Sequence, residues 1–247
     1  MNTLHFSQFV QEAFQTEQFI PLHVPVFKGN EKRYLEETID STFVSSVGAF
    51  VNTFEEQIAV FTQVKKSVAV VNGTAGLHLS LKVVGVETAD EVLTQALSFV
   101  ATVNAIAYCG AEPVFIDVDL DTMGLSPKHL KAFLDNFGEI RTDGTYNKKT
   151  NKRIAACVPM HTFGFMSRID EIVAICDQWN IPVVEDAAEA LGSLYKNKNA
   201  GSFGQMSAFS FNGNKIITSG GGGIVCTNDE SLADKAKFLS TTAKDPH

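Results

Sequence analysis

The chain has 247 residues, of which 45% are hydrophobic and 19% charged, and this composition is typical of a globular protein with a sizeable core. The length allows one large α/β domain or two small ones, and we favour one. With 28 Asp and Glu against 20 Lys and Arg, the formal net charge is -8. This balance excludes the broad basic face that a nucleic acid or an anionic membrane would bind.

The cysteine spacing and the first residues bear on the cellular compartment. Four widely spaced cysteines without a CxxC pair predict buried, reduced thiols and no metal site: Cys109, Cys157, Cys176 and Cys226. The opening MNTLHFSQFVQEAF lacks both the basic and the apolar region of a signal peptide, and no apolar run is long enough to span a bilayer. We therefore expect a cytoplasmic protein.

The first 61 residues differ in pattern from the rest of the chain. The weakly patterned stretch to about Pro25 predicts a helix and an extended arm. Between Asn30 and Phe61 the apolar spacing predicts two amphipathic helices around a polar turn at Ser45 to Gly48.

From residue 68 onward, short apolar runs alternate with helical patterns. Strands are predicted at 68–71, 91–96, 113–117, 154–159, 181–185, 207–211 and 223–226, and helices from about 76 and at 100–109, 169–179 and 231–239. The polar run 138–153 predicts a surface loop or hairpin. Repeated strand-helix-strand units with continuous apolar strands predict the α/β class, with a mostly parallel sheet covered by helices on both faces.

Ligands of such sheets bind beyond the carboxyl ends of the strands, so these ends are where chemistry is expected. After the first strand, the turn Asn72-Gly73-Thr74-Ala75 leads into a helix, whose free N–H groups and dipole could hold a phosphate. An ordinary glycine turn with the threonine as a helix cap would have the same sequence.

Three more strand ends carry distinctive side chains. Phe99 follows the second strand, Asp186 ends an apolar strand, and Ser210 precedes Lys215 by five residues. Taken singly, each has an ordinary explanation as a core ring, a helix cap, a polar strand end or a solvated lysine. The run Gly220 to Gly223 leads into a strand instead of a helix, which argues against a dinucleotide fingerprint and favours a flexible turn or a close approach of the backbone to a ligand.

Taken together, these residues have a chemical logic. A phosphate cradle, an aromatic ring, an acid and an amine are what a pyridoxal phosphate site requires, because the amine condenses with the aldehyde and the acid keeps the pyridine nitrogen protonated. Another open possibility is an oxidoreductase with a nucleotide cofactor on a similar sheet, although the first strand lacks the glycine fingerprint.

At these residues the sequence resembles the DegT/DnrJ/EryC1/StrS family of pyridoxal phosphate-dependent sugar aminotransferases, within the aspartate aminotransferase fold. The matching segments are NGTAGLHLSL, ALSFVATVNAIAYCGAEPVFIDVD, VVEDAAEALGS and SAFSFNGNKIITSGGGG, and the likeness extends from about Pro21 to His247. It implies that residues 1–247 form the cofactor-binding large domain, with an arm and helices at about 1–61. The smaller C-terminal domain of the family is expected to be absent, which suggests a fragment.

The resemblance implies a role for each matching residue. Lys215 resembles the lysine that condenses with the cofactor and moves the proton during transfer, and Asp186 resembles the partner of the pyridine nitrogen. Phe99 lies where the family places a ring against the cofactor. The positions that match the phosphate-binding residues are Gly73, Thr74, Ala75 and Ser210.

One position departs from the family pattern. Family members often carry Gln or His where this chain has Glu189, near the phenolic oxygen of the cofactor. A carboxylate there would have to be protonated or turned away, so no catalytic role is assigned to it.

The subgroup is indicated by FSFNGNKIITSGGGG and IDSTFVSSVGAFV, which look most like enzymes that aminate C4 of UDP-linked 4-keto-6-deoxy-N-acetylhexosamines. The implied amino donor is L-glutamate and the implied assembly a homodimer. Ser45 and Ser46 either line the sugar pocket or form an ordinary polar turn. Dehydratases of the family replace the lysine with His, so Lys215 argues against that branch. The alternative is a truncated, catalytically incompetent paralogue that acts as a binding or dimerisation module.

Overall fold

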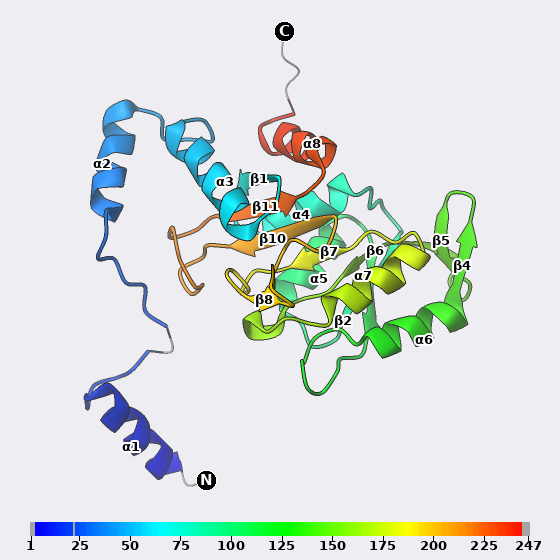
Figure 1. Ribbon diagram of the computed structural model, residues 1–247, viewed down its shortest axis with the longest axis horizontal. Helices are drawn as coiled ribbons and strands as arrows, with labels where there is room; N and C mark the ends of the chain where they lie inside the picture. The colour runs from blue at the N-terminus through cyan, green and yellow to red at the C-terminus, as the bar shows by residue number, and fades with distance from the viewer. Residues whose placement is uncertain (1–2, 22, 244–247) are drawn as a thin grey trace.

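The computed structural model describes residues 3–21 and 23–243, and its helices follow the expected order except for one at Pro127–Phe137, which was not expected from the sequence (Figure 1). They are α1 (Thr3–Phe14), α2 (Glu31–Ser41), α3 (Ala49–Thr62), α4 (Gly73–Val83), α5 (Val100–Tyr108), α6 (Pro127–Phe137), α7 (Ile169–Gln178) and α8 (Glu230–Ser240), with a 3-10 turn, η1, at Thr162–Gly164. The two helices expected between residues 30 and 61 are confirmed as α2 and α3. Residues 244–247, the end of the expected family likeness, lie outside the described part.

Eleven strands occur in the described residues. They are β1 (Lys66–Val70), β2 (Glu91–Gln95), β3 (Glu112–Ile116), β4 (Gly138–Arg141), β5 (Gly144–Asn147), β6 (Lys152–Val158), β7 (Val184–Asp186), β8 (Leu194–Tyr195), β9 (Lys198–Asn199), β10 (Met206–Ser210) and β11 (Gly223–Thr227). The polar run at 138–153 is a hairpin of β4 and β5 that pairs with the start of β6.

The main sheet is mostly parallel, as the strand pattern predicts. One part has the order β1-β11-β10-β7 and the other the order β3-β2-β6. A parallel bridge between Cys157 and Val183 joins the two parts, so β7 lies next to β6. Only β11 runs antiparallel to its neighbours β1 and β10 among these seven strands.

Helices cover both faces of this sheet, which confirms the predicted α/β architecture. The helices α4, α5 and α8 pack on one face, where Leu77, Leu81 and Ile106 are buried. On the other face α6 and α7 bury Leu134 and Ile172, and Figure 1 shows these two helices in front of the strands. Helix α3 extends that second face beside β1.

Buried side chains explain why the sheet is stable. Strands β2, β10 and β11 are buried along almost their whole length, as expected for strands covered on both faces.

All four cysteines are buried and unpaired, as their spacing predicts. Within residues 3–21 and 23–243, no helix combines the length and the apolar character needed to cross a membrane.

Candidate active site

A cavity of about 500 Å³ opens at the carboxyl ends of the parallel strands, where the topology predicts a ligand. Its lining includes six of the seven site residues expected from the sequence: Gly73, Thr74, Phe99, Asp186, Ser210 and Lys215. Ala75, Ser45 and Ser46 are not among the lining residues. Glu189 contributes to the wall.

The turn after β1 forms one end of the cavity. The side chain of Asn72 caps α4 by accepting a hydrogen bond from the Ala75 N–H at 2.8 Å, so that N–H is already occupied. No hydrogen bond within the described residues uses the N–H groups of Gly73 and Thr74, which begin the helix. These two groups and the helix dipole form a cradle for an anion.

Glycine is required in this turn because the chain passes close to Ser210. A Cβ atom at position 73 would lie 2.8 Å from the Cβ of Ser210, closer than side chains approach. The run of four glycines meets the same turn from the other side, where a Cβ on Gly223 would lie 2.5 Å from the carbonyl carbon of Asn72. At Gly223 the close approach is therefore to backbone instead of to a ligand, and it fixes the position of the anion cradle.

Asp186 ends β7 and is only 2% exposed, although its carboxylate lines the cavity. Thr102 of α5 donates a hydrogen bond to it at 2.6 Å, and the Ala188 N–H donates another at 3.2 Å. Burial raises the pKa of Asp186, and these hydrogen bonds, with the charges of His161 and Lys215, only partly oppose the effect. No ion pair to Asp186 exists within the described residues, so a cationic group of a ligand would find a buried anionic partner here.

Lys215 follows β10, and its side chain is only 12% exposed. Its Nζ lies 2.9 Å from Oε1 of Glu189 and 5.8 Å from the centroid of the Phe99 ring. The Glu189 carboxylate thus faces the lysine, an arrangement that the sequence did not indicate. The Phe99 ring is 64% exposed and covers one side of the cavity.

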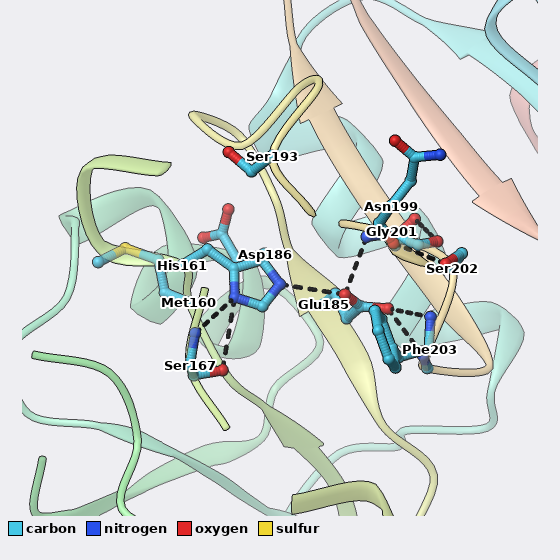
Figure 2. A network of polar contacts seen from close by, with 12 residues as sticks. Met160, His161, Ser167, Glu185, Asp186, Ser193, Asn199, Gly201, Ser202 and Phe203 are labelled. Carbon is cyan, nitrogen blue, oxygen red and sulfur yellow. Dashed lines mark hydrogen bonds and ion pairs between the residues drawn. The ribbon is translucent and has the colours of Figure 1, made fainter. Parts of the chain in front are cut away.

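A buried pair, His161 and Glu185, lies at the wall of the cavity, where His161 is one of the lining residues (Figure 2). His161 Nε2 and Glu185 Oε2 are 3.0 Å apart, and the Glu185 carboxylate also accepts hydrogen bonds from the N–H groups of Gly201, Phe203 and Gly204. Burial on its own would raise the pKa of Glu185. The hydrogen bonds from His161 and the backbone outweigh burial and hold that pKa below its ordinary value.

Several lining residues were not expected from the sequence. Met160, His161 and Thr162 follow β6, and the rule that ligands bind at carboxyl strand ends would have singled them out. The hydrogen bond between Thr102 and Asp186 had no sequence signal, because it joins residues 84 positions apart.

The residues present fit pyridoxal phosphate. The free N–H groups at α4 suit its phosphate, the buried Asp186 suits a protonated pyridine nitrogen, and the amine of Lys215 suits its aldehyde. A mostly parallel sheet with these groups at its strand ends is the arrangement of pyridoxal phosphate-dependent enzymes with the aspartate aminotransferase fold.

Comparison with known proteins gives the family. The model of the DegT/DnrJ/EryC1/StrS aminotransferase family matches residues 25–246, and the chain belongs to this family. This match confirms the expected family and fold. It also confirms, as properties of the family, the use of pyridoxal phosphate and the transfer of amino groups to sugars.

Individual relatives agree with this assignment. A Bacillus subtilis (strain 168) protein named "Putative pyridoxal phosphate-dependent aminotransferase EpsN" is 43% identical over 227 residues, covering 92% of this chain and 56% of that protein. GDP-perosamine synthase of Caulobacter vibrioides is 39% identical over 228 residues, covering 92% and 57%. The structure of Helicobacter pylori PseC, an aminotransferase of pseudaminic acid biosynthesis, superposes with a TM-score of 0.80 at 26% identity, covering 93% and 58%. The chain therefore spans a little over half the length of these relatives.

Proposed function

We propose that this chain is the cofactor-binding large domain of a pyridoxal phosphate-dependent nucleotide-sugar aminotransferase. The observation that carries the proposal is the position of the Lys215 amine, which lies in the same cavity as the buried Asp186 and the Phe99 ring. Membership of the aminotransferase family supports the reaction type. The share of its relatives that the chain covers supports its assignment as one domain of a larger enzyme.

Each of these residues has a distinct task in the proposed reaction. When bound, pyridoxal phosphate would supply an electron sink for the pair released as a C–H bond breaks. The Gly73 and Thr74 N–H groups and the Ser210 hydroxyl would hold its phosphate, and Phe99 would pack against its ring. Asp186 would keep the pyridine nitrogen protonated. The amine of Lys215 would take the proton from Cα of the donor amino acid and return it at C4′.

The finer proposal concerns the substrates. L-Glutamate gives its amino group in the first half of the reaction, and C4 of a UDP-linked 4-keto-6-deoxy-N-acetylhexosamine receives it in the second. The support is the likeness of FSFNGNKIITSGGGG and IDSTFVSSVGAFV to such enzymes. The relative from Caulobacter vibrioides is named for a GDP-linked sugar, so the test compares the two nucleotides.

The visible absorbance of the purified chain tests both the binding of pyridoxal phosphate and the identity of the substrates. With pyridoxal phosphate present, we expect a band that L-glutamate bleaches, because the amino group then resides on the cofactor. Adding the UDP-linked keto sugar is expected to restore the band, with the GDP-linked sugar as the control. Restoration by the GDP-linked sugar alone would overturn the substrate, and absence of any band would overturn cofactor binding by this chain.

We also propose that two copies of the chain associate across the mouth of the cavity. Large apolar side chains are exposed around it, including Val71 at 78%, Phe163 at 82% and Ile216 at 57%. Exposed apolar groups gathered in this way are typical of protein interfaces. Sedimentation velocity is expected to show a concentration-dependent dimer, and Phe163→Ser with Ile216→Ser is expected to weaken it. A monomer at all concentrations would contradict this proposal.

A further inference from the structure

The side chain of Gln95, the last residue of β2, is fully buried beneath the wall of the cavity. Its Oε1 accepts hydrogen bonds from the N–H groups of Leu125 and Met160, each at 3.0 Å. Its Nε2 donates to the Leu97 carbonyl at 2.9 Å and to Thr162 Oγ1 at 3.1 Å, with a longer contact to the Met123 carbonyl at 3.4 Å. All hydrogen-bonding sites of this amide are therefore occupied.

These partners belong to three separate loops at the carboxyl edge of the sheet. Leu97 follows β2, Leu125 lies between β3 and α6, and Met160 and Thr162 follow β6. Leu97, Met160 and Thr162 also line the cavity, whereas Leu125 and Met123, which both lie between β3 and α6, do not. A buried amide that is fully satisfied tolerates little movement of its partners, because an unpaired polar group in an apolar setting is costly. Gln95 thus fixes the three loops relative to one another.

Met160 carries this constraint to the ring that faces Lys215. While its N–H is held by Gln95, its Sδ accepts a hydrogen bond from the Phe99 N–H at 3.3 Å. Phe99 is also the residue that caps the start of α5. The position of the Phe99 backbone therefore depends on Met160, and so does the point from which the Phe99 ring projects.

The same residue is paired with the end of β7. A parallel bridge joins Met160 to Asp186, with hydrogen bonds from the Asp186 N–H to the Pro159 carbonyl at 2.9 Å and from the His161 N–H to the Asp186 carbonyl at 3.1 Å. Figure 2 shows Met160 and His161 beside Asp186. One amide thus holds the segment that borders both the aromatic ring and the buried acid.

A purely structural role would look different, and the neighbouring residue provides the comparison. Thr94 is also fully buried, but its hydroxyl makes one hydrogen bond, to the Val158 carbonyl at 2.8 Å, within the sheet. Because successive residues of a strand point to opposite faces, Thr94 is directed away from the loops that Gln95 joins.

We propose that Gln95 is a positioning residue, which sets the Phe99 ring and the Asp186 carboxylate at the separation that the cofactor ring requires. The inference rests on the proposed function, since it concerns the same cavity. Gln95 does not touch the reacting atoms and acts through Met160.

The test compares Gln95→Met with Thr94→Val in the full chain. Methionine keeps the size of glutamine but leaves the Leu125 and Met160 N–H groups without their acceptor. We expect Gln95→Met to bind pyridoxal phosphate about tenfold more weakly or worse. The induced circular dichroism of the bound cofactor is expected to fall as well, because this signal depends on how the ring is held. Thr94→Val, which also loses one buried hydrogen bond, is expected to retain both properties.

A second measurement needs no cofactor. Hydrogen exchange of the Phe99, Met160 and Asp186 N–H groups is expected to accelerate in Gln95→Met and to stay unchanged in Thr94→Val. If the unaltered chain forms no absorbance band with pyridoxal phosphate, the proposed function fails. The exchange rates still decide whether Gln95 positions the carboxyl edge of the sheet.

Unchanged exchange in folded Gln95→Met would overturn the inference, as would unchanged cofactor affinity and dichroism. If Gln95→Met does not fold, Met160→Leu replaces it, because leucine keeps the apolar volume and removes only the sulfur acceptor. Faster exchange at Phe99 with weaker cofactor binding in Met160→Leu supports the inference, and wild-type values for both overturn it.

Discussion

Replacing Lys215 with alanine is expected to abolish the absorbance band that the chain forms with pyridoxal phosphate and to stop amino transfer from L-glutamate. The variant lacks the amine that condenses with the aldehyde and the base that moves the proton. General acid–base catalysis alone contributes about 10² to 10⁴ in rate, so the loss should exceed about a thousandfold. The measurement is the single-turnover change in absorbance after L-glutamate is added.

Lys196→Ala is the matched control, because it removes a lysine from the surface. The Lys196 side chain is 64% exposed and pairs with Asp170, and it is not part of the cavity lining. This variant should behave like the unaltered chain. A Lys215→Ala protein that still forms the band and transfers the amino group at a normal rate would refute the assignment of the reactive lysine.

The second large effect is expected for Glu185→Ala, and it concerns stability instead of chemistry. Removing the carboxylate leaves His161 and the N–H groups of Gly201, Phe203 and Gly204 without their shared acceptor in a fully buried place. Breaking a buried pair in this way costs about 3–5 kcal/mol, a large part of the roughly 5–15 kcal/mol that stabilises a typical domain. Denaturant unfolding measures the loss.

The control is Glu139→Ala, which breaks an ion pair with Arg141 at the surface and should cost about 1 kcal/mol or less. An equal loss in both variants would contradict the importance of the buried carboxylate. The pH dependence gives a further check. Because the folded protein holds the pKa of Glu185 below its ordinary value of 4.5, its contribution is fully present above pH 4.5. It is lost as the pH falls through the lower folded pKa, and the Glu185→Ala protein should lack this part of the acid sensitivity.

Most of the fold could be predicted from the sequence because buried parallel strands consist of continuous apolar runs. The observed strand boundaries differ from the predicted ones where a backbone group cannot form a hydrogen bond to the neighbouring strand. The strand expected at 181–185 is formed only from Val184 to Asp186, since Pro182 has no N–H to donate. In contrast, β6 begins at Lys152, earlier than its apolar run, because the β5 hairpin pairs with its polar start.

The direction of β11 was not predicted, although the sequence contains a clue. The twelve residues between Ser210 and Gly223 are the least that a parallel crossover needs, and they have no helical pattern. A parallel connection needs a crossover of a dozen or more residues, usually with a helix, whereas an antiparallel neighbour needs only a loop. The loop that carries Lys215 is therefore bounded by two adjacent antiparallel strands.

The residues of the candidate site could be predicted only where a distinctive side chain stands at or after a strand end. Gln95 and Thr102 act through hydrogen bonds to partners far along the chain, and neither has a spacing that indicates this role. The contact between Lys215 and Glu189 is of the same kind, because it depends on how two loops approach each other. Such contacts follow from the three-dimensional arrangement, which periodicity does not encode.

The position of β11 in the sheet also determines when the first strand, β1, finds its partner during synthesis of the chain. Strand β1 lies at the border of the main sheet, and its sheet neighbour is β11, with Lys66 opposite Thr227. These partners are separated by about 160 residues, so β1 leaves the ribosome long before the strand it pairs with. The turn that follows β1 carries Gly73 and Thr74 and is packed against Gly223. Among the described residues, this end of the cavity is therefore completed after every other strand of the sheet has been made.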